Sequence, residues 1–350
     1  MPGGSNPPGR MGYPFDRAGR GWRAGGRGTF RESIAPGCDQ ARHIRDDLIA
    51  EYRGLTVEDA FSGREVACPT GSCYVLESRS PMTEGLDGRD PERATAAILA
   101  DLTLVPGIGG ATRQRLQRQG YRTIADLVRH PLYCRDAARI LDGILGRDTC
   151  GLMEWIGRRH RQSDPLLLEV SRFHAPETFV FLDIETLGLS SRPIVLIGLA
   201  RVEGDAIAIR QYLLRSLNEE AAALATALPD LEAEGAALVT FNGRAFDLPF
   251  IRERLVRYGI PADLGAPHFD ALLFARRRWK GSIPACRLNV LETEVLGVER
   301  QDDLPGWMVP EFYDIYRRTG NPGPLIPVVE HNRQDLVSLA RLFALLRGDE

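Results

Sequence analysis

The most constraining feature of the sequence is an apolar segment that contains two acidic residues, Phe-Val-Phe-Leu-Asp-Ile-Glu-Thr at residues 179–186. Aromatic and β-branched residues in such a run favour a buried strand. Side chains alternate between the two faces of a strand, so Asp183 and Glu185 share one face. Two neighbouring buried carboxylates are unfavourable unless cations neutralise them. The segment therefore predicts a buried strand that carries a metal site.

Two later segments place further acids at the ends of predicted secondary structure. An apolar strand runs into Asn242, and a helix is expected to begin near Asp247. Open α/β sheets bind ligands at such strand-to-helix junctions. Near the C-terminus, His331 and Asp335 are four residues apart and share one face of an apolar helix. The four acids suit two Mg²⁺ or Mn²⁺ ions, a pair that can activate water and cleave a phosphodiester.

The three segments, in this order and spacing, resemble the three exonuclease motifs of the DEDD superfamily, whose fold is RNase H-like. The similarity is greatest to the YprB-like group of predicted bacterial 3′–5′ exonucleases and covers about residues 178–346. Further segments that fit this group are His268–Leu273, Arg277–Trp279, Leu288–Gly297, Leu304–Gly306 and His331-Asn332. The resemblance implies a mixed α/β sheet flanked by helices and a nuclease that uses two metal ions.

The resemblance also implies a role for each site residue. Asp183 would bridge both metal ions. Glu185 and Asp335 would complete the ion on the side of the attacking water, and Asp247 would hold the second ion. His331 would orient or deprotonate that water as the general base.

The role of His331 is open because its spacing is unusual for the superfamily. In one branch a His precedes the last acid by five positions, and in another a Tyr precedes it by four. Here a His stands at the four-residue spacing from Asp335. The alternative interpretations are that His331 binds a phosphate or caps its helix.

Other residues of this half are candidate contacts with nucleic acid. We expect Thr186 and Asn242 to contact its backbone. Asp270 is either an additional carboxylate of the metal site or an ordinary surface charge or helix cap. The basic run 276–278 either binds phosphate or forms a solvated face.

A glycine-rich turn, Leu-Val-Pro-Gly-Ile-Gly at residues 104–109, follows a helix predicted at 91–102. Glycines allow a tight turn, and the free N–H groups at the start of the next helix suit a phosphate oxygen. The segment resembles a helix-hairpin-helix motif, in which a small residue is usual where Arg113 stands. The candidate nucleic-acid contacts are Gly107, Gly109, Arg113, Arg115 and Arg118. The alternative interpretation is a helical hairpin that binds nothing.

The charge of the chain is unevenly distributed. The whole chain has a formal net charge of −3. Residues 101–164 carry 11 Arg against 7 acids, whereas residues 165–350 carry 20 basic residues against 26 acids. A basic segment beside an acidic one is expected if the first binds a polyanion, DNA or RNA, and the second binds metal ions.

Composition excludes two classes of protein. Hydrophobic residues make up 43% of the 350 residues and charged residues 26%, which excludes a chain disordered throughout. No apolar run approaches the ~20 residues that cross a bilayer, and the N-terminus lacks the apolar core of a signal peptide. We therefore expect a cytoplasmic protein with reduced cysteines and no membrane partner. Cys68 and Cys73 lack a second pair for zinc.

These observations predict four segments. The expected segments are a disordered Gly/Arg-rich tail at 1–40, a segment with short strands at 41–90, a helix-hairpin-helix module at 91–165 and an RNase H-like exonuclease domain at 178–350. The tail either contacts nucleic acid through its arginines or is merely solvated. The expected reaction is 3′–5′ exonucleolytic hydrolysis. The alternatives are a structure-specific endonuclease and a nucleic-acid-binding adaptor without catalysis.

Overall fold

The computed structural model describes residues 38–82, 85–86, 89–300 and 304–348. The tail predicted at residues 1–40 lies almost entirely outside these ranges. The described residues belong to one compact unit. None of their helices combines the length and the apolar character needed to cross a bilayer. Cys68, Cys73, Cys134, Cys150 and Cys286 are free thiols.

A mixed sheet of seven strands forms the centre of the described structure, in the order β1-β2-β5-β4-β3-β6-β7. The strands are β1 Gly63–Cys68, β2 Gly71–Pro81, β3 Phe179–Thr186, β4 Ile194–Glu203, β5 Ala206–Leu213, β6 Ala237–Thr240 and β7 His268–Asp270. In this spatial order, each neighbouring pair from β1 through β2, β5 and β4 to β3 is antiparallel. The pairs β3–β6 and β6–β7 are parallel. The predicted fold class, a mixed sheet flanked by helices, is confirmed.

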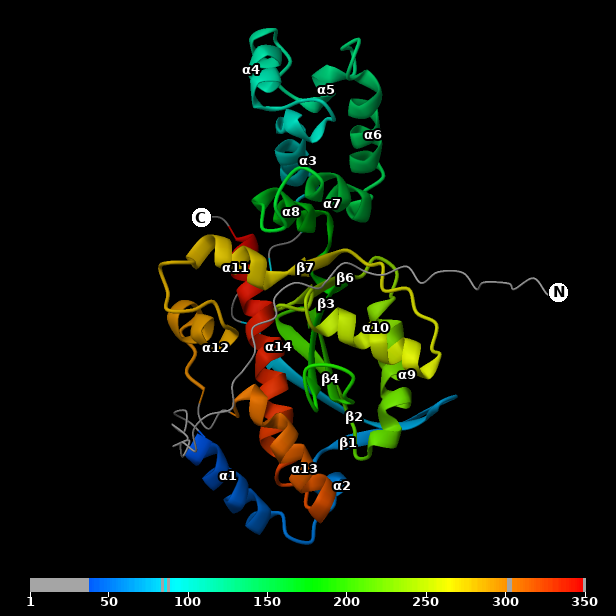
Figure 1. Ribbon diagram of the computed structural model, residues 1–350, viewed down its shortest axis with the longest axis vertical. Coiled ribbons are helices and arrows are strands. Elements are labelled where there is room, and N and C mark those ends of the chain that lie inside the picture. Colours follow the sequence, from blue (N-terminus) through cyan, green and yellow to red (C-terminus); the bar gives the residue numbers. More distant parts are fainter. Residues whose placement is uncertain (1–37, 83–84, 87–88, 301–303, 349–350) are drawn as a thin grey trace, which may run out of the picture. The chain divides into compact units, whose positions relative to one another are not determined.

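Helices cover both faces of this sheet (Figure 1). Those that follow β5 in the chain are α9 Glu220–Leu231, α10 Asp247–Tyr258, α11 Ala271–Trp279, α12 Leu288–Leu291, α13 Val309–Thr319 and α14 Leu325–Arg347. In Figure 1 the long red helix α14 runs along one side of the strands, and α9 and α10 lie on the other. The sheet is therefore buried between two helical layers, as its nearly continuous apolar strands require.

The remaining helices precede β3 in the chain. They are α1 Cys38–Glu51, α2 Val57–Ala60, α3 Pro91–Ala100, α4 Gly110–Arg118, α5 Ile124–Leu127, α6 Cys134–Leu145, α7 Thr149–Gly157 and α8 Pro165–Glu169. Shorter 3₁₀ or π turns are η1 Leu102–Leu104, η2 Val170–Phe173, η3 Pro176–Thr178, η4 Leu217–Glu219, η5 Glu292–Leu296 and η6 Gly306–Met308. The apolar side chains of α3 to α7 continue into the core cluster that also contains residues of β3, β6, α11 and α14.

The strands β1 and β2 form a hairpin that belongs to the main sheet. From the sequence, these short strands are expected in a separate segment at residues 41–90. In the structure β2 pairs with β5 from Tyr74 to Pro81 and covers what would otherwise be an open sheet edge. The burial of Tyr74, Val75 and Leu76 against the core stabilises this arrangement.

The alternation of side chains along β3 divides the core into two layers. Val180 and Leu182 belong to the apolar cluster that includes α9 and α10. Phe179 and Phe181 belong to the cluster on the other face, where both rings contact Phe343 of α14 at centroid distances of 5.1 and 6.1 Å. Because side chains alternate along a strand, the two acids of β3, Asp183 and Glu185, lie on the same face as these two rings, the face toward α14.

Two buried histidines make the stability of the fold sensitive to acid. Burial lowers the pKa of His174 to about 4 and that of His268 to about 3. The unfolded chain takes up these protons near pH 6.5, whereas the folded chain does not, so stability is lost as the pH falls below 6.5.

We expect each of these histidines to cost about 2 kcal/mol of unfolding free energy between pH 7 and pH 5. Chemical denaturation at the two pH values measures this loss. The variant His268→Gln should lose about 2 kcal/mol less than the wild type over the same interval, because one of the two titrating groups is removed. An equal loss in the two proteins would contradict the assignment.

Candidate active site

Asp183 lies at the centre of a group of acidic residues. It stands on β3 and receives a hydrogen bond from Asn332 Nδ2 to its Oδ2 at 2.7 Å. Burial raises the pKa of Asp183 well above its ordinary value, and the negative charges of Asp335, Glu185 and Asp247 raise it further. The charges of the other three predicted carboxylates thus act on Asp183.

Asp247 occupies the first position of α10, where the sequence predicts that a helix begins. Its side chain is buried, and burial raises its pKa to about 7. Hydrogen bonds from its own backbone and that of Ile184 act in the opposite direction, and the charges of Asp270 and Asp335 raise the pKa. The N-terminal end of α10 therefore carries a second carboxylate whose pKa is raised by burial.

Asp335 and His331 share one face of α14, as their spacing predicts. His331 Nε2 lies 3.8 Å from Asp335 Oδ2. Arg300 forms an ion pair with Asp335, and its NH1 lies 3.1 Å from His331 Nδ1. Arg300 also holds the fully buried Glu292, with 2.5 Å between Nε and Oε2. Arg300 and Glu292 were not among the predicted site residues, although Glu292 lies in the segment Leu288–Gly297 that fits the family.

Asn332 is the other site residue that motif reasoning undervalued. It is fully buried, and besides its bond to Asp183 it accepts a hydrogen bond from Gln211 Nε2 at 2.8 Å. Gln211 in turn donates to the carbonyl oxygen of Val329 at 2.9 Å. This chain of hydrogen bonds links β5, α14 and β3, and it fixes the orientation of the Asp183 carboxylate.

The close packing around Asn332 leaves no room for a side chain on the neighbouring strand. Gly198 of β4 pairs with Asp183 of β3. A Cβ atom at position 198 would lie 2.2 Å from Asn332 Oδ1. Glycine is therefore required there by the approach of α14 to the sheet.

Asp270, predicted as a possible accessory carboxylate, accepts hydrogen bonds from backbone N–H groups. It accepts hydrogen bonds from the N–H groups of Asn242 at 2.8 Å, Arg244 at 3.2 Å and Leu272 at 3.2 Å. It caps α11 and fixes the loop that leads to Asp247. Burial raises the pKa of Asp270, and the charge of Asp270 raises the pKa of Asp247.

The two predicted backbone contacts, Thr186 and Asn242, lie at the ends of their strands. Asn242 is exposed and adopts a left-handed conformation with φ of 69°. Asparagine tolerates this region better than most residues do. Thr186 Oγ1 donates to the carbonyl oxygen of Gly188 at 2.8 Å. Both residues stand on segments that also carry a predicted metal ligand.

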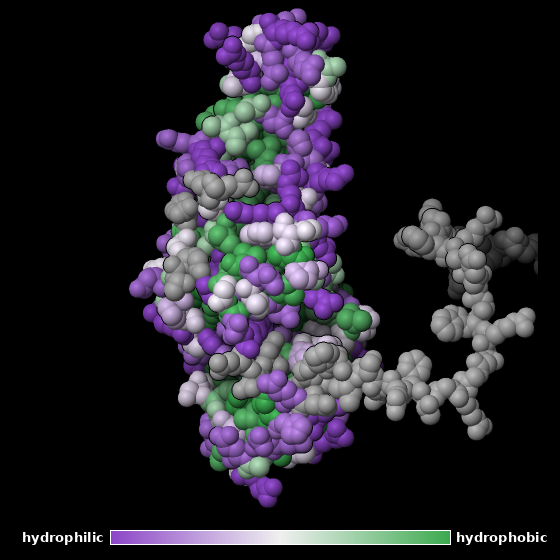
Figure 2. All heavy atoms as spheres, turned by 90° about the vertical axis from the view of Figure 1, so that its left-hand side faces the viewer, coloured by the Kyte–Doolittle hydropathy of each residue, from purple (hydrophilic) through white to green (hydrophobic). Residues whose placement is uncertain are grey.

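The predicted hairpin residues belong to a different part of the fold, around α4. Gly107 has φ of +84°, a conformation that favours glycine, and Gly109 precedes the first residue of α4. On α4 only Leu116 is buried, and the arginines 113, 115 and 118 are exposed. Figure 2 shows mainly hydrophilic atoms at the end of the molecule where α4 lies. The hairpin and the four acids are thus carried by different elements.

Comparison with known proteins identifies the domain that carries the acids. A family model of the RNase_H superfamily matches residues 180–347. Residues 180–347, slightly less than half of the chain, are thus RNase H-like. A curated relative, the uncharacterized protein YprB of Bacillus subtilis (strain 168), is 36% identical over 168 residues. The match covers 47% of this chain and 40% of that relative, so it speaks for the RNase H-like domain alone.

Nucleases of the RNase H superfamily generally use divalent metal ions, so the fit of the acidic site to such ions can be tested. Within the described ranges, no three His, Cys, Asp or Glu side chains form a ready-made metal cluster. The chemistry of the donors nevertheless fits. Asp183 is half-buried, and three other carboxylates raise its pKa; carboxylate oxygens are the ligands that Mg²⁺ and Mn²⁺ prefer. A cation would relieve this repulsion, as Arg300 does at Asp335.

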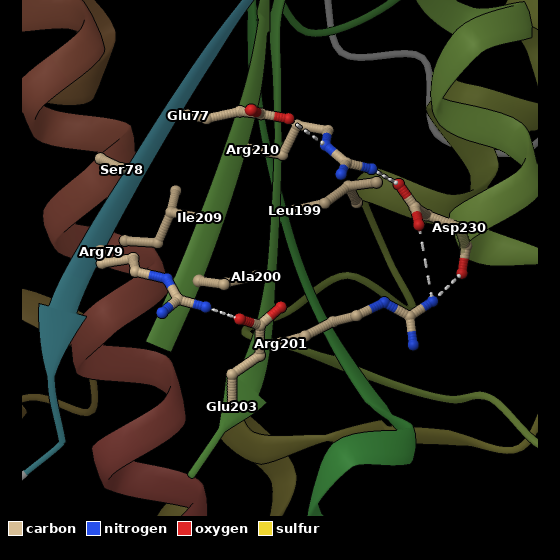
Figure 3. A pocket seen from close by; sticks show the side chains of 11 residues that line it. Glu77, Ser78, Arg79, Leu199, Ala200, Arg201, Glu203, Ile209, Arg210 and Asp230 are labelled. Carbon is tan, nitrogen blue, oxygen red and sulfur yellow. Dashed lines mark hydrogen bonds and ion pairs between the residues drawn. The ribbon is translucent and has the colours of Figure 1, made fainter. Parts of the chain in front are cut away.

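A pocket of about 520 Å³ lies over β2, β4 and β5, and none of the four predicted acids lines it (Figure 3). Its charged side chains neutralise one another. The pairs are Arg79–Glu203, Arg201–Asp230 at 3.7 Å, Arg210–Asp230 at 2.7 Å and Arg210–Glu77 at 3.2 Å. Three arginines against three acids leave no excess charge for a ligand, so we do not place the active site here.

Proposed function

We propose that this protein is a two-metal-ion nuclease that hydrolyses the phosphodiester bonds of nucleic acid from the 3′ end. The observation that supports the proposal is that three other carboxylates raise the pKa of the half-buried Asp183 in an RNase H-like domain. Such a group is unfavourable in a folded protein unless cations bind there. The arrangement therefore suits a site that binds two Mg²⁺ or Mn²⁺ ions.

The site residues would have different roles in hydrolysis. Asp183 and Glu185 would hold cations from β3, Asp335 from α14, and Asp247 from the start of α10. When bound, the two cations activate water and stabilise the leaving oxygen. The chain of hydrogen bonds through Asn332 would keep the Asp183 carboxylate in one orientation while the substrate is exchanged.

His331 can serve as a base only after a rearrangement. Arginine donates and never accepts, so the contact with Arg300 NH1 makes His331 Nδ1 an acceptor. In the neutral ring the proton then resides on Nε2, on the side of Asp335. For His331 to take a proton from water at Nδ1, Arg300 must first move away.

A digestion panel tests the proposed function. Single- and double-stranded DNA and RNA, labelled at the 5′ end, are incubated with the full chain in Mg²⁺, Mn²⁺ or EDTA. We expect a ladder that shortens from the 3′ end and releases mononucleotides, only with a metal ion. Discrete internal fragments would instead indicate the endonuclease.

A second candidate, a nucleic-acid-binding protein without catalysis, is favoured by one observation. Arg300 already pairs with Asp335 and competes there with a metal ion. Tight binding of an oligonucleotide with no degradation in either metal would support this candidate and contradict the nuclease.

The loss of Asn332 is expected to slow hydrolysis without unfolding the domain. Asn332→Leu removes the donor to Asp183, and Gly198→Ala displaces Asn332 through the 2.2 Å approach. Groups that orient a metal ligand are worth about 10- to 100-fold in activity or metal affinity, so both variants should lose that much. Gln334→Leu, on the same helix, is the control. Rates in saturating Mg²⁺ and titration of Mn²⁺ measure the effect, and two variants as active as Gln334→Leu would refute it.

We also propose that the hairpin at α4 holds the backbone of the substrate. The support is the positive φ of Gly107 and the three exposed arginines on α4. Replacing Arg113, Arg115 and Arg118 by Gln should weaken binding and reduce the slope of log K against log salt by about 2 to 3, since each lost phosphate contact changes it by about 0.7 to 0.9. The melting temperature should stay within a few degrees. An unchanged salt slope would contradict the proposal and indicate that the hairpin at α4 does not bind the substrate backbone.

A further inference from the structure

A buried ion pair between Arg300 and Glu292 lies beside the acidic site. Arg300 Nε donates to Glu292 Oε2 at 2.5 Å, and NH2 donates to Oε1 at 2.7 Å. The side chain of Glu292 is 0% exposed and that of Arg300 is 9% exposed. Two N–H bonds to one carboxylate fix the plane of a guanidinium group. Glu292 therefore determines where the guanidinium of Arg300 lies.

Glu292 is itself fixed against α14. It is the first residue of η5, which follows α12, the orange helix beside α14 in Figure 1, and contacts α14. Ser338 Oγ of α14 donates to Glu292 Oε1, and the N–H of Val298 donates to the carbonyl oxygen of Glu292 at 2.9 Å. The segment from Glu292 to Arg300 is thus attached to the helix that carries Asp335.

The side of the Arg300 guanidinium that faces away from Glu292 contacts the acidic site. NH2 also donates to Asp335 Oδ1, and NH1 lies 3.1 Å from His331 Nδ1. Arginine has several N–H donors in one rigid plane, so one guanidinium can bind Glu292 with one edge and Asp335 with another. Arg300 thus connects a buried carboxylate with a predicted metal ligand.

The two carboxylate partners of Arg300 differ in how easily they can be exchanged. Glu292 is fully buried, and breaking a buried ion pair leaves a charge without compensation, which is strongly unfavourable. The side chain of Asp335 is 18% exposed, and a metal ion bound there would compete with Arg300 for the same charge. The contact with Asp335 is therefore the one that can be given up while Glu292 keeps Arg300 in place.

We propose that Arg300 is a phosphate-binding residue, which contacts Asp335 in the metal-free protein and the phosphodiester group of the substrate in the metal-loaded protein. The proposal rests on the proposed function for the metal ions and the substrate. A guanidinium group matches the oxygens of a phosphate as it matches those of a carboxylate. Glu292 is the positioning residue that keeps Arg300 beside the site during the exchange. The contact with His331 Nδ1 is given up in the same movement, as a role of His331 as base requires.

The first test measures the affinity for Mn²⁺ without nucleic acid, from the electron paramagnetic resonance signal of the unbound ion. In Glu292→Gln the charge of Arg300 acts on Asp335 alone, so this variant should bind Mn²⁺ more weakly than the wild type. Glu292→Gln/Arg300→Met lacks the competitor and should bind Mn²⁺ at least about tenfold more tightly than Glu292→Gln, the usual effect of a charge-assisted contact. Both variants lack the buried carboxylate, so a purely structural role of the pair predicts no such difference.

The matched control is Glu330→Gln/Arg333→Met, which removes another ion pair of α14 and the same pair of charges. Its affinity for Mn²⁺ should equal that of the wild type. Equal affinities of Glu292→Gln and Glu292→Gln/Arg300→Met would overturn the proposal, because Arg300 would then not compete with the ion. Melting temperatures of the metal-free proteins establish that each variant is folded. If the double variant does not fold, an affinity of Glu292→Gln equal to or above that of the wild type contradicts the competition.

The second test measures binding of a hydrolysis-resistant strand, a fluorescent phosphorothioate oligonucleotide of about twelve nucleotides. In saturating Mn²⁺, Glu292→Gln/Arg300→Met should bind it at least about tenfold more weakly than the control does, because the phosphate contact is lost. In EDTA the two variants should bind it equally, because Arg300 then contacts Asp335. Both variants keep the net charge of the wild type, so general attraction of a polyanion cannot produce this difference. A loss of the same size with and without Mn²⁺, or no loss in either condition, would overturn the phosphate contact.

These measurements separate the role of Arg300 from the nuclease itself. Mn²⁺ affinities that are the same in all variants, together with digestion of nucleic acid, refute the role of Arg300 and leave the nuclease supported. Absence of Mn²⁺ binding in both the wild type and the double variant refutes the metal site on which the two proposals depend. The expected order of Mn²⁺ affinities supports the exchange of partners even where no digestion occurs.

Discussion

Changing Asp183 to asparagine is expected to reduce phosphodiester hydrolysis at least about a thousand-fold, because positioned groups and metal-activated water each contribute several powers of ten. Asp183 is the carboxylate whose pKa is raised by all three of the other acids. An amide of the same shape keeps the hydrogen bond from Asn332 as an acceptor but loses the charge that holds a cation. Initial rates in Mg²⁺ and in Mn²⁺ measure the loss.

The same variant should be more stable than the wild type when no metal is present. A raised pKa means that folding disfavours the ionised form, so this carboxylate costs stability increasingly as the pH rises. The gain in melting temperature should therefore be larger at pH 8 than at pH 5, and Mg²⁺ should diminish it. Asp314→Asn, at a half-exposed position of α13, is the control; it loses two surface ion pairs, so it should leave activity unchanged and change stability by less than about 1 kcal/mol. A less stable Asp183→Asn protein would mean that activity is lost through unfolding.

The second large effect is expected at Arg254, which anchors the helix that begins at Asp247. Arg254 Nε donates to Glu220 Oε1 at 2.6 Å, and both side chains are at most 3% exposed. Glu220 also accepts from Tyr258 at 2.7 Å and from the N–H of Ile194 at 2.9 Å. Replacing Arg254 by methionine leaves a buried carboxylate without its counter-charge, which should cost about 3 to 5 kcal/mol of unfolding free energy.

A surface ion pair offers a matched control for this experiment. Arg158 and Glu154 are separated by 2.5 Å, but their side chains are 65% and 64% exposed. Water screens this pair, so Arg158→Met should cost less than about 1 kcal/mol. The double variant Glu220→Met/Arg254→Met should regain most of the loss, since no lone charge is then buried. Urea denaturation measures all three, and equal costs for the two single variants would contradict the argument.

The loss at Arg254 should also affect the site. The ion pair joins α9 to α10, and Asp247 is the first residue of α10. A variant that remains folded below its melting temperature should therefore bind Mn²⁺ more weakly than Arg158→Met does. This comparison distinguishes the positioning of Asp247 from general instability.

The sequence alone was sufficient for the features that depend on local periodicity. Alternation in residues 179–186 correctly predicted a buried strand, and the spacing of His331 and Asp335 correctly predicted a shared helical face. The start of a helix at Asp247 followed from the change of pattern after a strand. The mixed sheet flanked by helices was predicted and is confirmed. The metal ions, the direction of cutting and the hairpin's ligand stay predictions.

The tertiary structure decided the features that join distant segments. The side-chain pattern of residues 63–81 does not determine which strand they pair with. The pairing is determined by β5, whose edge β2 covers in the folded structure. Arg300 reaches Asp335 and His331 across a loop, and Asn332 reaches Asp183 across 149 residues of chain. Local pattern fixes which face a side chain occupies, whereas burial and charge balance depend on which segments fold against it.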